Sequence, residues 1–279
     1  MKKFKTLLNI YKEDGLDGVI YNILKKIGFK VRFPNILQKK RYLLGQKIAK
    51  KFNNTIFYGP YKGTMLLNDI AWSSNDLSSK YIGLYEIQIQ KKIIELKDKF
   101  DLKYFVNLGA GDGFHIIGLL KKNYFQKGYA FEKDENSRIL IKKNSKLNQL
   151  EDNLKIFGEA NENFIDEYLK DLNLSQTLFL IDIEGAEYKI FNDKVFKKLS
   201  FSHMIFENHD KFSFINQNYI KNFNQIIKQN FNSEIIKTGS RDPGNFAEFD
   251  DFSDNDRWLM MSEGRRWNMT WQIVSPKNI

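Results

Sequence analysis

The stretch Asn107-Leu108-Gly109-Ala110-Gly111-Asp112-Gly113 decides the fold. It follows an apolar run of strand type at residues 104–108, and its glycines allow the chain to turn tightly and to approach a ligand closely. A dinucleotide fingerprint would have Gly or Ala at the sixth position, where this chain has Phe114, so the GxGxG pattern argues against NAD. Two interpretations remain at this point, a nucleotide-binding turn and a plain strand-to-helix turn.

Short apolar runs alternate with longer stretches of helical spacing from Lys103 onward. This alternation is typical of a parallel sheet covered by helices, so we predict an α/β fold with a Rossmann-like, mostly parallel sheet of seven strands. No helix-length periodic stretch separates the last two strands, and we therefore expect the last one to return antiparallel at the sheet edge. The predicted strands are residues 104–108, 128–132, 154–157, 178–183, 204–207, 233–237 and 269–274.

Composition sets limits on the chemistry. A chain of 279 residues with 42% hydrophobic residues can bury one large core. The absence of cysteine excludes disulfides, thiolate catalysis and cysteine-ligated metal centres. The three histidines, His115, His203 and His209, lack the close spacing of a helical zinc motif. We therefore expect no zinc and assign no metal-binding residue, and we expect His115 and His203 to be structural.

Positive charge is concentrated at the N-terminus. Residues 1–60 have a net charge of +11 and the remainder −1, within a total of +10. We divide the chain into a basic helical arm with its connector, residues 1–79, and a cofactor-binding domain, residues 80–279. Apolar residues at helical spacing over residues 16–27 predict an amphipathic helix. This helix either packs on the main domain or lies on an anionic membrane or on RNA.

The sequence carries no signal for membrane insertion or export. No apolar run approaches the roughly 20 residues that a membrane-spanning helix needs, and Met1-Lys2-Lys3 is not followed by an apolar signal-peptide core. We therefore expect a cytoplasmic protein whose basic arm would allow peripheral contact with the inner face of the membrane.

Carboxylates stand where the predicted strands end. Glu132 ends the second strand, where a carboxylate can accept both ribose hydroxyls of a nucleoside. Glu159 follows the third strand and either meets an adenine amino group or is simply solvated. The fourth strand leads into Asp182, Glu184 and Glu187. Burying unpaired carboxylates is costly, so such a cluster is more often a site than a core.

The stretch Leu180-Ile181-Asp182-Ile183-Glu184-Gly185-Ala186-Glu187 resembles the signature of the FkbM family of S-adenosylmethionine-dependent methyltransferases. Its DxEGxE pattern follows GxGxG and a strand-terminal acid in the same order, and the resemblance covers residues 83–276. It implies a class I methyltransferase fold, S-adenosylmethionine as cofactor, and methylation of hydroxyl groups, often on sugars or secondary metabolites.

The resemblance also implies a set of cofactor-binding residues. Such enzymes commonly carry an acid at the position of Asn107, where it helps to hold the methionine portion of the cofactor. Asn107 keeps hydrogen-bonding capacity but carries no charge, and Glu86 would supply the missing carboxylate to the cofactor's ammonium group. The predicted cofactor-binding residues are Glu86, Asn107, Gly109, Gly111, Gly113, Glu132, Glu159 and Asp182.

The first candidate for a general base is His209. The fifth predicted strand ends in Phe206-Glu207-Asn208-His209-Asp210, and on this topology its end should face the methyl group. A base at that place assists a hydroxyl nucleophile. A histidine that caps a helix or fills the pocket wall is the alternative. Asp182 would orient the cofactor or the acceptor, and Glu184 would hold an acceptor hydroxyl or a divalent cation.

Three functions from different classes remain. We favour an O-methyltransferase that acts on a sugar, a glycan or another small molecule. The aromatic and charged loop at residues 246–267 suits a sugar or an anionic acceptor, and equally a partner interface. An RNA methyltransferase has only the basic arm in its favour, so we do not expect nucleic acid as the partner. A non-catalytic Rossmann-like binding protein is suggested by Asn107.

Overall fold

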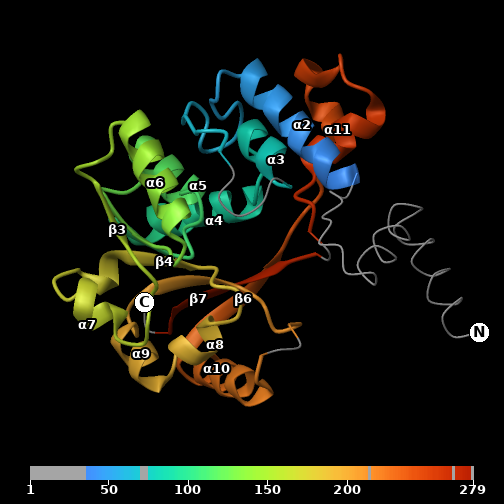
Figure 1. Ribbon diagram of the computed structural model, residues 1–279. Coiled ribbons are helices and arrows are strands. Elements are labelled where there is room, and N and C mark those ends of the chain that lie inside the picture. The colour runs from blue at the N-terminus through green and yellow to red at the C-terminus, as the bar shows by residue number, and fades with distance from the viewer. Residues whose placement is uncertain (1–35, 70–74, 213–214, 266–267, 278–279) are drawn as a thin grey trace, which may run out of the picture. The chain divides into compact units, whose positions relative to one another are not determined.

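A computed structural model describes residues 36–69, 75–212, 215–265 and 268–277 (Figure 1). The chain divides into two compact units, Met1–Lys40 and Arg41–Ile279. Of the first unit, the described part is the beginning of helix α2 (Ile36–Lys51). The amphipathic helix predicted over residues 16–27 lies outside the described residues.

The second unit is an α/β fold around a sheet that has seven strands in the described residues. Its strand order is β3-β2-β1-β4-β5-β7-β6. The first five strands in this order run parallel to one another. The strands are β1 (Tyr104–Leu108), β2 (Lys127–Phe131), β3 (Leu154–Phe157), β4 (Thr177–Ile181), β5 (His203–Glu207), β6 (Phe231–Lys237) and β7 (Thr270–Pro276). All seven predicted strands are present, each within two residues of its predicted ends.

The last strand returns antiparallel, as predicted, but it does not lie at the sheet edge. β7 pairs with β5 on one side and with β6 on the other, antiparallel to both. β6 forms this edge of the sheet instead, and most of its residues are exposed, including the polar Glu234 and Lys237. The chain leaves β5, passes through α10 (Gln217–Asn230) and forms β6 one strand position away, and β7 later fills the position between them. The spacing of strands in the sequence does not reveal this order.

Helices cover both faces of the sheet (Figure 1). On one face lie α4, α5 and α6, and on the other α7, α8, α9 and α10. Side chains alternate along a strand, and in β4 they feed both layers: Leu178 and Leu180 belong to the first core, Phe179 and Ile181 to the second. The helices are α3 (Leu77–Ile82), α4 (Ile87–Phe100), α5 (Phe114–Lys121), α6 (Glu135–Leu147), α7 (Phe164–Tyr168), α8 (Glu187–Ile190), α9 (Asp193–Lys198), α10 (Gln217–Asn230) and α11 (Asp254–Met261).

The segment before the sheet packs into the same core as the sheet itself. Leu44, Ile48 and Tyr61 are buried together with residues of α4 and α5. A Cβ at Gly118 would lie 2.5 Å from the ring of Tyr61, so this glycine allows close contact between the segment and α5. The division between residues 79 and 80 stays a prediction; in the structure these two residues lie in α3, and the second compact unit comprises Arg41–Ile279. The turn residues that suggested a connector lie in a packed segment.

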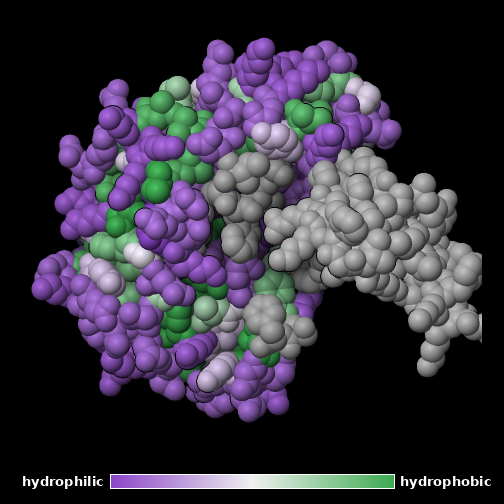
Figure 2. All heavy atoms as spheres, in the orientation of Figure 1, coloured by the Kyte–Doolittle hydropathy of each residue, from purple (hydrophilic) through white to green (hydrophobic). Residues whose placement is uncertain are grey.

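Polar side chains dominate the described surface in the view of Figure 2, with hydrophobic residues in scattered patches between them. Large exposed hydrophobic side chains include Tyr58, Phe201 and Trp258. Among the residues described, the helices are either too short or too polar to cross a membrane.

Candidate active site

The glycine turn lies at the carboxyl end of β1 and begins α5. Gly109, Gly111 and Gly113 all have positive φ angles, of 79°, 56° and 85°. A Cβ at Gly109 would lie 1.7 Å from the backbone oxygen of Asp182, so only glycine fits between β1 and β4. A Cβ at Gly111 would meet no described atom within 4 Å. The turn therefore combines a close backbone contact with open space above it, where a ligand can approach.

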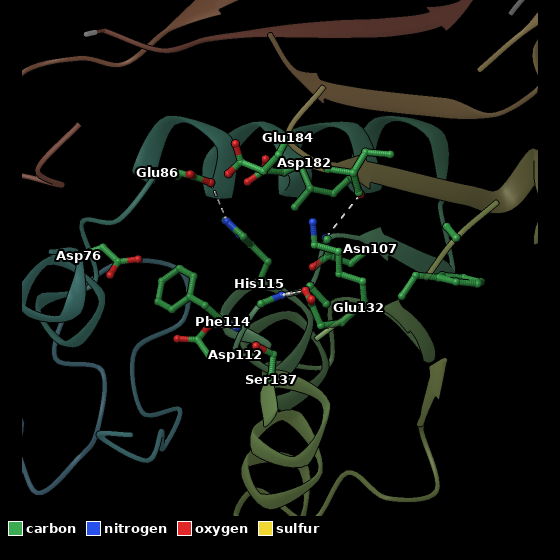
Figure 3. A pocket seen from close by; sticks show the side chains of 18 of the residues that line it. Asp76, Glu86, Asn107, Asp112, Phe114, His115, Glu132, Ser137, Asp182 and Glu184 are labelled. Carbon is green, nitrogen blue, oxygen red and sulfur yellow. Dashed lines mark hydrogen bonds and ion pairs between the residues drawn. The ribbon is translucent and has the colours of Figure 1, made fainter. Parts of the chain in front are cut away.

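A pocket opens beside this turn (Figure 3). Asp182, Glu184 and Glu86 lie on one side of it, and Glu132 lies with Ser137 on the other. The structure thus brings together residues from the ends of β1, β2, β3 and β4, as expected for an open parallel sheet. Of the predicted residues, the pocket lining includes Glu86, Asn107, Gly109, Gly111, Glu132, Glu159, Asp182 and Glu184. Gly113 and His209 lie outside the lining.

Glu132 is held in place by the backbone. The Gly111 N–H donates to Oε2 at 2.8 Å, and the Asp134 N–H donates to Oε1 at 2.9 Å. Each carboxylate oxygen keeps a second lone pair, so the group is positioned to accept from two further hydroxyls. Glu159 lines the pocket and is also exposed, so both of its predicted roles stay open.

At the other end of the pocket, Glu86 is buried and connects two networks. Its Oε2 lies 2.9 Å from His115 Nε2, and His115 Nδ1 lies 3.1 Å from the Tyr61 hydroxyl. With the ring proton on Nε2, His115 donates to Glu86 and accepts from Tyr61. The Glu86 N–H donates to Glu263 Oε1 at 2.8 Å. His115 therefore orients the carboxylate of Glu86, and it also lines the pocket. Its structural role stays a prediction.

Arg265 supplies positive charge to the carboxylates around Glu86. Its guanidinium group pairs with Glu86, with Glu207 and, through Nε at 2.7 Å, with Glu263. Burial would lower the pKa of Arg265, but the neighbouring Glu86 and the other acidic groups raise the pKa above its usual value. The arginine stays charged and ties three carboxylates together. It comes from the loop at residues 246–267, for which the sequence predicted acceptor or partner contacts.

His209 lies behind the pocket wall, surrounded by carboxylates. Nδ1 lies 2.8 Å from Glu187 Oε1, and both side chains are only 1% exposed. Nε2 lies 3.3 Å from Glu207 Oε2, 3.4 Å from Asp182 Oδ1 and 3.8 Å from Glu184 Oε2. The structure thus joins the predicted catalytic residues Asp182, Glu184 and His209 in one cluster. Glu207 also belongs to this cluster, although no role was predicted for it from the sequence.

The acidic surroundings change the protonation of the cluster. Burial would lower the pKa of His209, but hydrogen bonds with Glu187 and Glu207 raise it to about 11. Burial, together with the charge of Glu207, raises the pKa of Asp182 well above its usual value. Burial would also raise the pKa of Glu207, but contacts with His209 and Arg265 lower it to about 2. In this arrangement His209 is charged at neutral pH and Asp182 holds the more basic carboxylate.

One buried donor in the pocket has no hydrogen-bond partner among the described residues. Trp271, on β7, lines the pocket and is 1% exposed. Its indole Nε1–H makes no hydrogen bond to any residue that the structure describes. Buried donors are rarely left unsatisfied, so an oxygen of a bound ligand is a natural partner for this group.

Comparisons with known proteins give similarity in structure alone. No protein-family model matches this chain, and no curated protein matches it. Among solved structures, it is similar to an O-methyltransferase from Bacillus cereus in complex with SAH, with 10% identity, 91% of this chain and 96% of that chain covered, and a TM-score of 0.48. A precorrin-6y C5,15-methyltransferase from Geobacter metallireducens has 13% identity over 68% of this chain and 89% of its own, with a TM-score of 0.41. A tRNA methyltransferase from B. subtilis has 8% identity over 67% of this chain and 64% of its own, with a TM-score of 0.40.

Proposed function

We propose that this chain is an S-adenosylmethionine-dependent methyltransferase that methylates a hydroxyl group of a sugar, a glycan or another small molecule. One observation carries the proposal: a single pocket joins the glycine turn and Glu132 to the carboxylates Asp182 and Glu184. A nucleoside site and a site for a polar acceptor are thereby adjacent. The sugar or glycan class of the acceptor follows from the sequence resemblance.

The residues present fit the proposed cofactor. Glu132 would accept from the ribose hydroxyls, because the backbone already orients both of its oxygens. The space above Gly111 accommodates the ligand, and Trp271 Nε1–H would donate to one of its oxygens. Asn107 is nearly buried, and its amide donates to the Leu180 carbonyl at 3.5 Å. Because Asn107 carries no charge, Glu86, which lines the pocket, would supply the negative charge for an ammonium group. The bound cofactor would supply a methyl group on a positively charged sulfonium.

At the acceptor end, the chain's contribution is positioning and proton handling. Alignment of the nucleophile provides much of the acceleration in such transfers. Glu184 is partly exposed and lies next to Asp182, so this pair would hold the acceptor hydroxyl. The role of His209 as general base stays a prediction, and it requires that the imidazole first give up its proton. Asp182 is the alternative acceptor for that proton, because its raised pKa makes its ionised form a stronger base.

Calorimetry with S-adenosylmethionine and, separately, with NAD tests the proposal directly. We expect S-adenosylmethionine to bind and NAD not to bind, since Phe114 departs from the dinucleotide pattern. Absence of S-adenosylmethionine binding would overturn the proposal. Transfer of a labelled methyl group should then be screened with sugars, lipid-linked glycans and RNA. Binding without transfer to any acceptor would favour the non-catalytic alternative, and salt-dependent transfer to RNA would favour the RNA methyltransferase.

A further inference from the structure

We propose that Asp182, Glu207 and His209 bind one divalent metal ion at the acceptor end of the pocket. The sequence suggested a divalent cation only as one of two roles for Glu184 and assigned no metal-binding residue, so this ligand set goes beyond that expectation. The role of the ion in catalysis rests on the proposed methyltransferase function, but its binding does not.

The three ligand atoms converge because of the sheet topology. β4 and β5 are parallel neighbours, and Asp182 follows the end of β4 while Glu207 ends β5. His209 comes two residues later. Each of the three residues offers one ligand atom, and these atoms all lie within 4.8 Å of one another. His209 Nε2 approaches Asp182 through Oδ1 and Glu207 through Oε2. The nitrogen is 3.4 Å from the first oxygen and 3.3 Å from the second.

These separations suit ligands of one ion. Two ligands that each lie about 2.1 Å from a metal, at adjacent positions of its coordination shell, are roughly 3.0–3.5 Å apart. The distances from His209 Nε2 to both carboxylate oxygens lie in this range. The three groups need to move little to coordinate a common ion.

A second shell of contacts already orients two of the ligands. Glu187 holds His209 through Nδ1 at 2.8 Å. Binding of the ion would displace the proton from Nε2, and the proton that stays on Nδ1 would keep its bond with Glu187. Arg265 binds Oε1 of Glu207, so the other oxygen, Oε2, is the one that faces His209. A carboxylate behind a ligating histidine is the usual support of a metal-binding imidazole.

The third ligand carries an independent sign of a missing partner. Asp182 Oδ1 is buried and lies at ion-pair distance, 3.4 Å, from His209 Nε2, yet it makes no hydrogen bond within the described ranges of the chain. Burial of an unsatisfied carboxylate oxygen is costly, and an ion at this place would satisfy it. Four carboxylates, those of Asp182, Glu184, Glu187 and Glu207, surround the ring of His209. Arg265 pairs with one of them, Glu207, and with a neutral His209 the cluster keeps an excess of negative charge that a divalent cation would offset.

The donor set indicates the class of metal. Two carboxylate oxygens and one imidazole nitrogen suit Mn²⁺ better than Ca²⁺, which prefers oxygen ligands alone. Glu184 lies 3.8 Å from Nε2 and lines the pocket together with Asp182, so the proposed ion would adjoin the pocket, where an acceptor hydroxyl would reach it. A metal-bound hydroxyl has a lowered pKa, so the ion would supply the activation for which the sequence suggested a histidine base.

Binding of Mn²⁺ to the full chain, freed of metal with EDTA and followed by calorimetry and electron paramagnetic resonance, tests this inference. We expect one bound Mn²⁺ per chain in the absence of S-adenosylmethionine. Asp182→Asn keeps the side-chain shape and should abolish binding at concentrations that saturate the unchanged protein. Glu187→Gln should weaken binding about 10- to 100-fold without removing it, since it acts through His209. Asp210→Asn is the matched control, because this exposed carboxylate adjoins His209 in the sequence, and it should bind as the unchanged protein does.

Two results would overturn the inference: no Mn²⁺ binding at millimolar concentrations, or binding that Asp182→Asn and His209→Gln leave unchanged. Thermal unfolding of each variant, measured without metal, identifies any variant that fails to fold. If His209→Gln fails to fold, the Mn²⁺ binding of Asp182→Asn alone decides whether the metal site exists. Cofactor binding is measured in parallel on the EDTA-treated protein. Mn²⁺ binding without S-adenosylmethionine binding would keep the metal site and reject the methyltransferase, and the reverse result would reject the metal site alone.

Discussion

His209 Nδ1 lies 2.8 Å from Glu187 Oε1, and both side chains are almost completely buried. The same Glu187 carboxylate accepts a hydrogen bond from the Gly185 N–H at 2.9 Å. Glu187 therefore links the turn after β4 to the segment after β5. All three acids of the DxEGxE pattern lie around His209: Asp182 and Glu184 lie near Nε2, and Glu187 lies next to Nδ1.

Replacement of Glu187 by glutamine should lower the stability of the fold. The variant removes a buried charge that pairs with His209, and hydrogen bonds to charged groups contribute about 1.5–3 kcal/mol. We expect the free energy of unfolding, measured in urea, to fall by roughly 1–3 kcal/mol. Glu151→Gln, at an exposed position, serves as the control and should change it by less than about 0.5 kcal/mol. Equal stability of the two variants would show that the buried pair contributes nothing.

Gly109 and Gly111 should respond differently to alanine. Gly109→Ala places a Cβ 1.7 Å from the Asp182 oxygen, so we expect a loss of roughly 3 kcal/mol or more in unfolding free energy. Gly111→Ala meets no described atom and should cost only about 1–2 kcal/mol, for its positive φ. The alanine methyl at residue 111 would, however, fill the space offered to the ligand. Calorimetry with S-adenosylmethionine should show weakened binding for this folded variant, and unchanged affinity would place the cofactor elsewhere.

Glu132→Gln should weaken the cofactor without disturbing the fold. The change removes the charge that would accept from the ribose hydroxyls, and charge-assisted hydrogen bonds are worth about 1.5–3 kcal/mol. The dissociation constant for S-adenosylmethionine should rise by roughly 10- to 150-fold. Glu135→Gln, an exposed neighbour in the first turn of α6, is the control. The hypothesis fails if both variants bind with the same affinity.

His203 should make stability sensitive to acid. Burial, and then the charge of Lys99, lower the pKa of His203 to about 4, and its ring stacks on Phe100 at 4.1 Å. Between about pH 6.5 and pH 4, His203 is therefore protonated in the unfolded chain, where its pKa is near 6.5, but neutral in the folded chain. Stability contributed by neutral His203 is present above this window and decreases as the pH falls through it, by at most ~1.4 kcal/mol per pH unit.

Urea unfolding of the unchanged protein and of His203→Gln at pH 7, 6 and 5 isolates this effect, because the other titrating groups are common to both. We expect the difference in stability between the two proteins to shrink as the pH is lowered. A difference that stays constant would mean that the histidine titrates alike in the folded and the unfolded chain.

Local patterns predicted much of the fold. The seven strands, the glycine turn after β1 and the carboxylates after β4 all follow from short-range spacing, and the structure places them as expected. The position of β7 between β5 and β6 could not be predicted, because strand order depends on which edges pair after the chain has folded. Long-range partners were missed for the same reason. Arg265 meets Glu86 across 179 residues of sequence, and no periodicity links them.

The sequence did contain signals for two of the missed residues. Glu207 is the last residue of β5, and Glu132 directly follows β2, so the rule that found one carboxylate could have found the other. Glu187 was part of the acidic cluster, but its burial behind His209 depends on the turn at Gly185. By contrast, the contact between Tyr61 and His115 depends on the packing of the segment before the sheet, which composition indicated only as a connector.

The insertion of β7 between β5 and β6 has a consequence for synthesis on the ribosome. Residues 203–207 and 231–237 emerge first, but in the finished sheet each of them pairs with β7 and not with the other. Until residues 270–276 appear, the outer edge of β5 carries unpaired backbone groups, which are prone to pair with other chains. Trp271 arrives with the same strand. The nascent protein therefore has to shield an open sheet edge, and its pocket wall is completed only when that edge is closed.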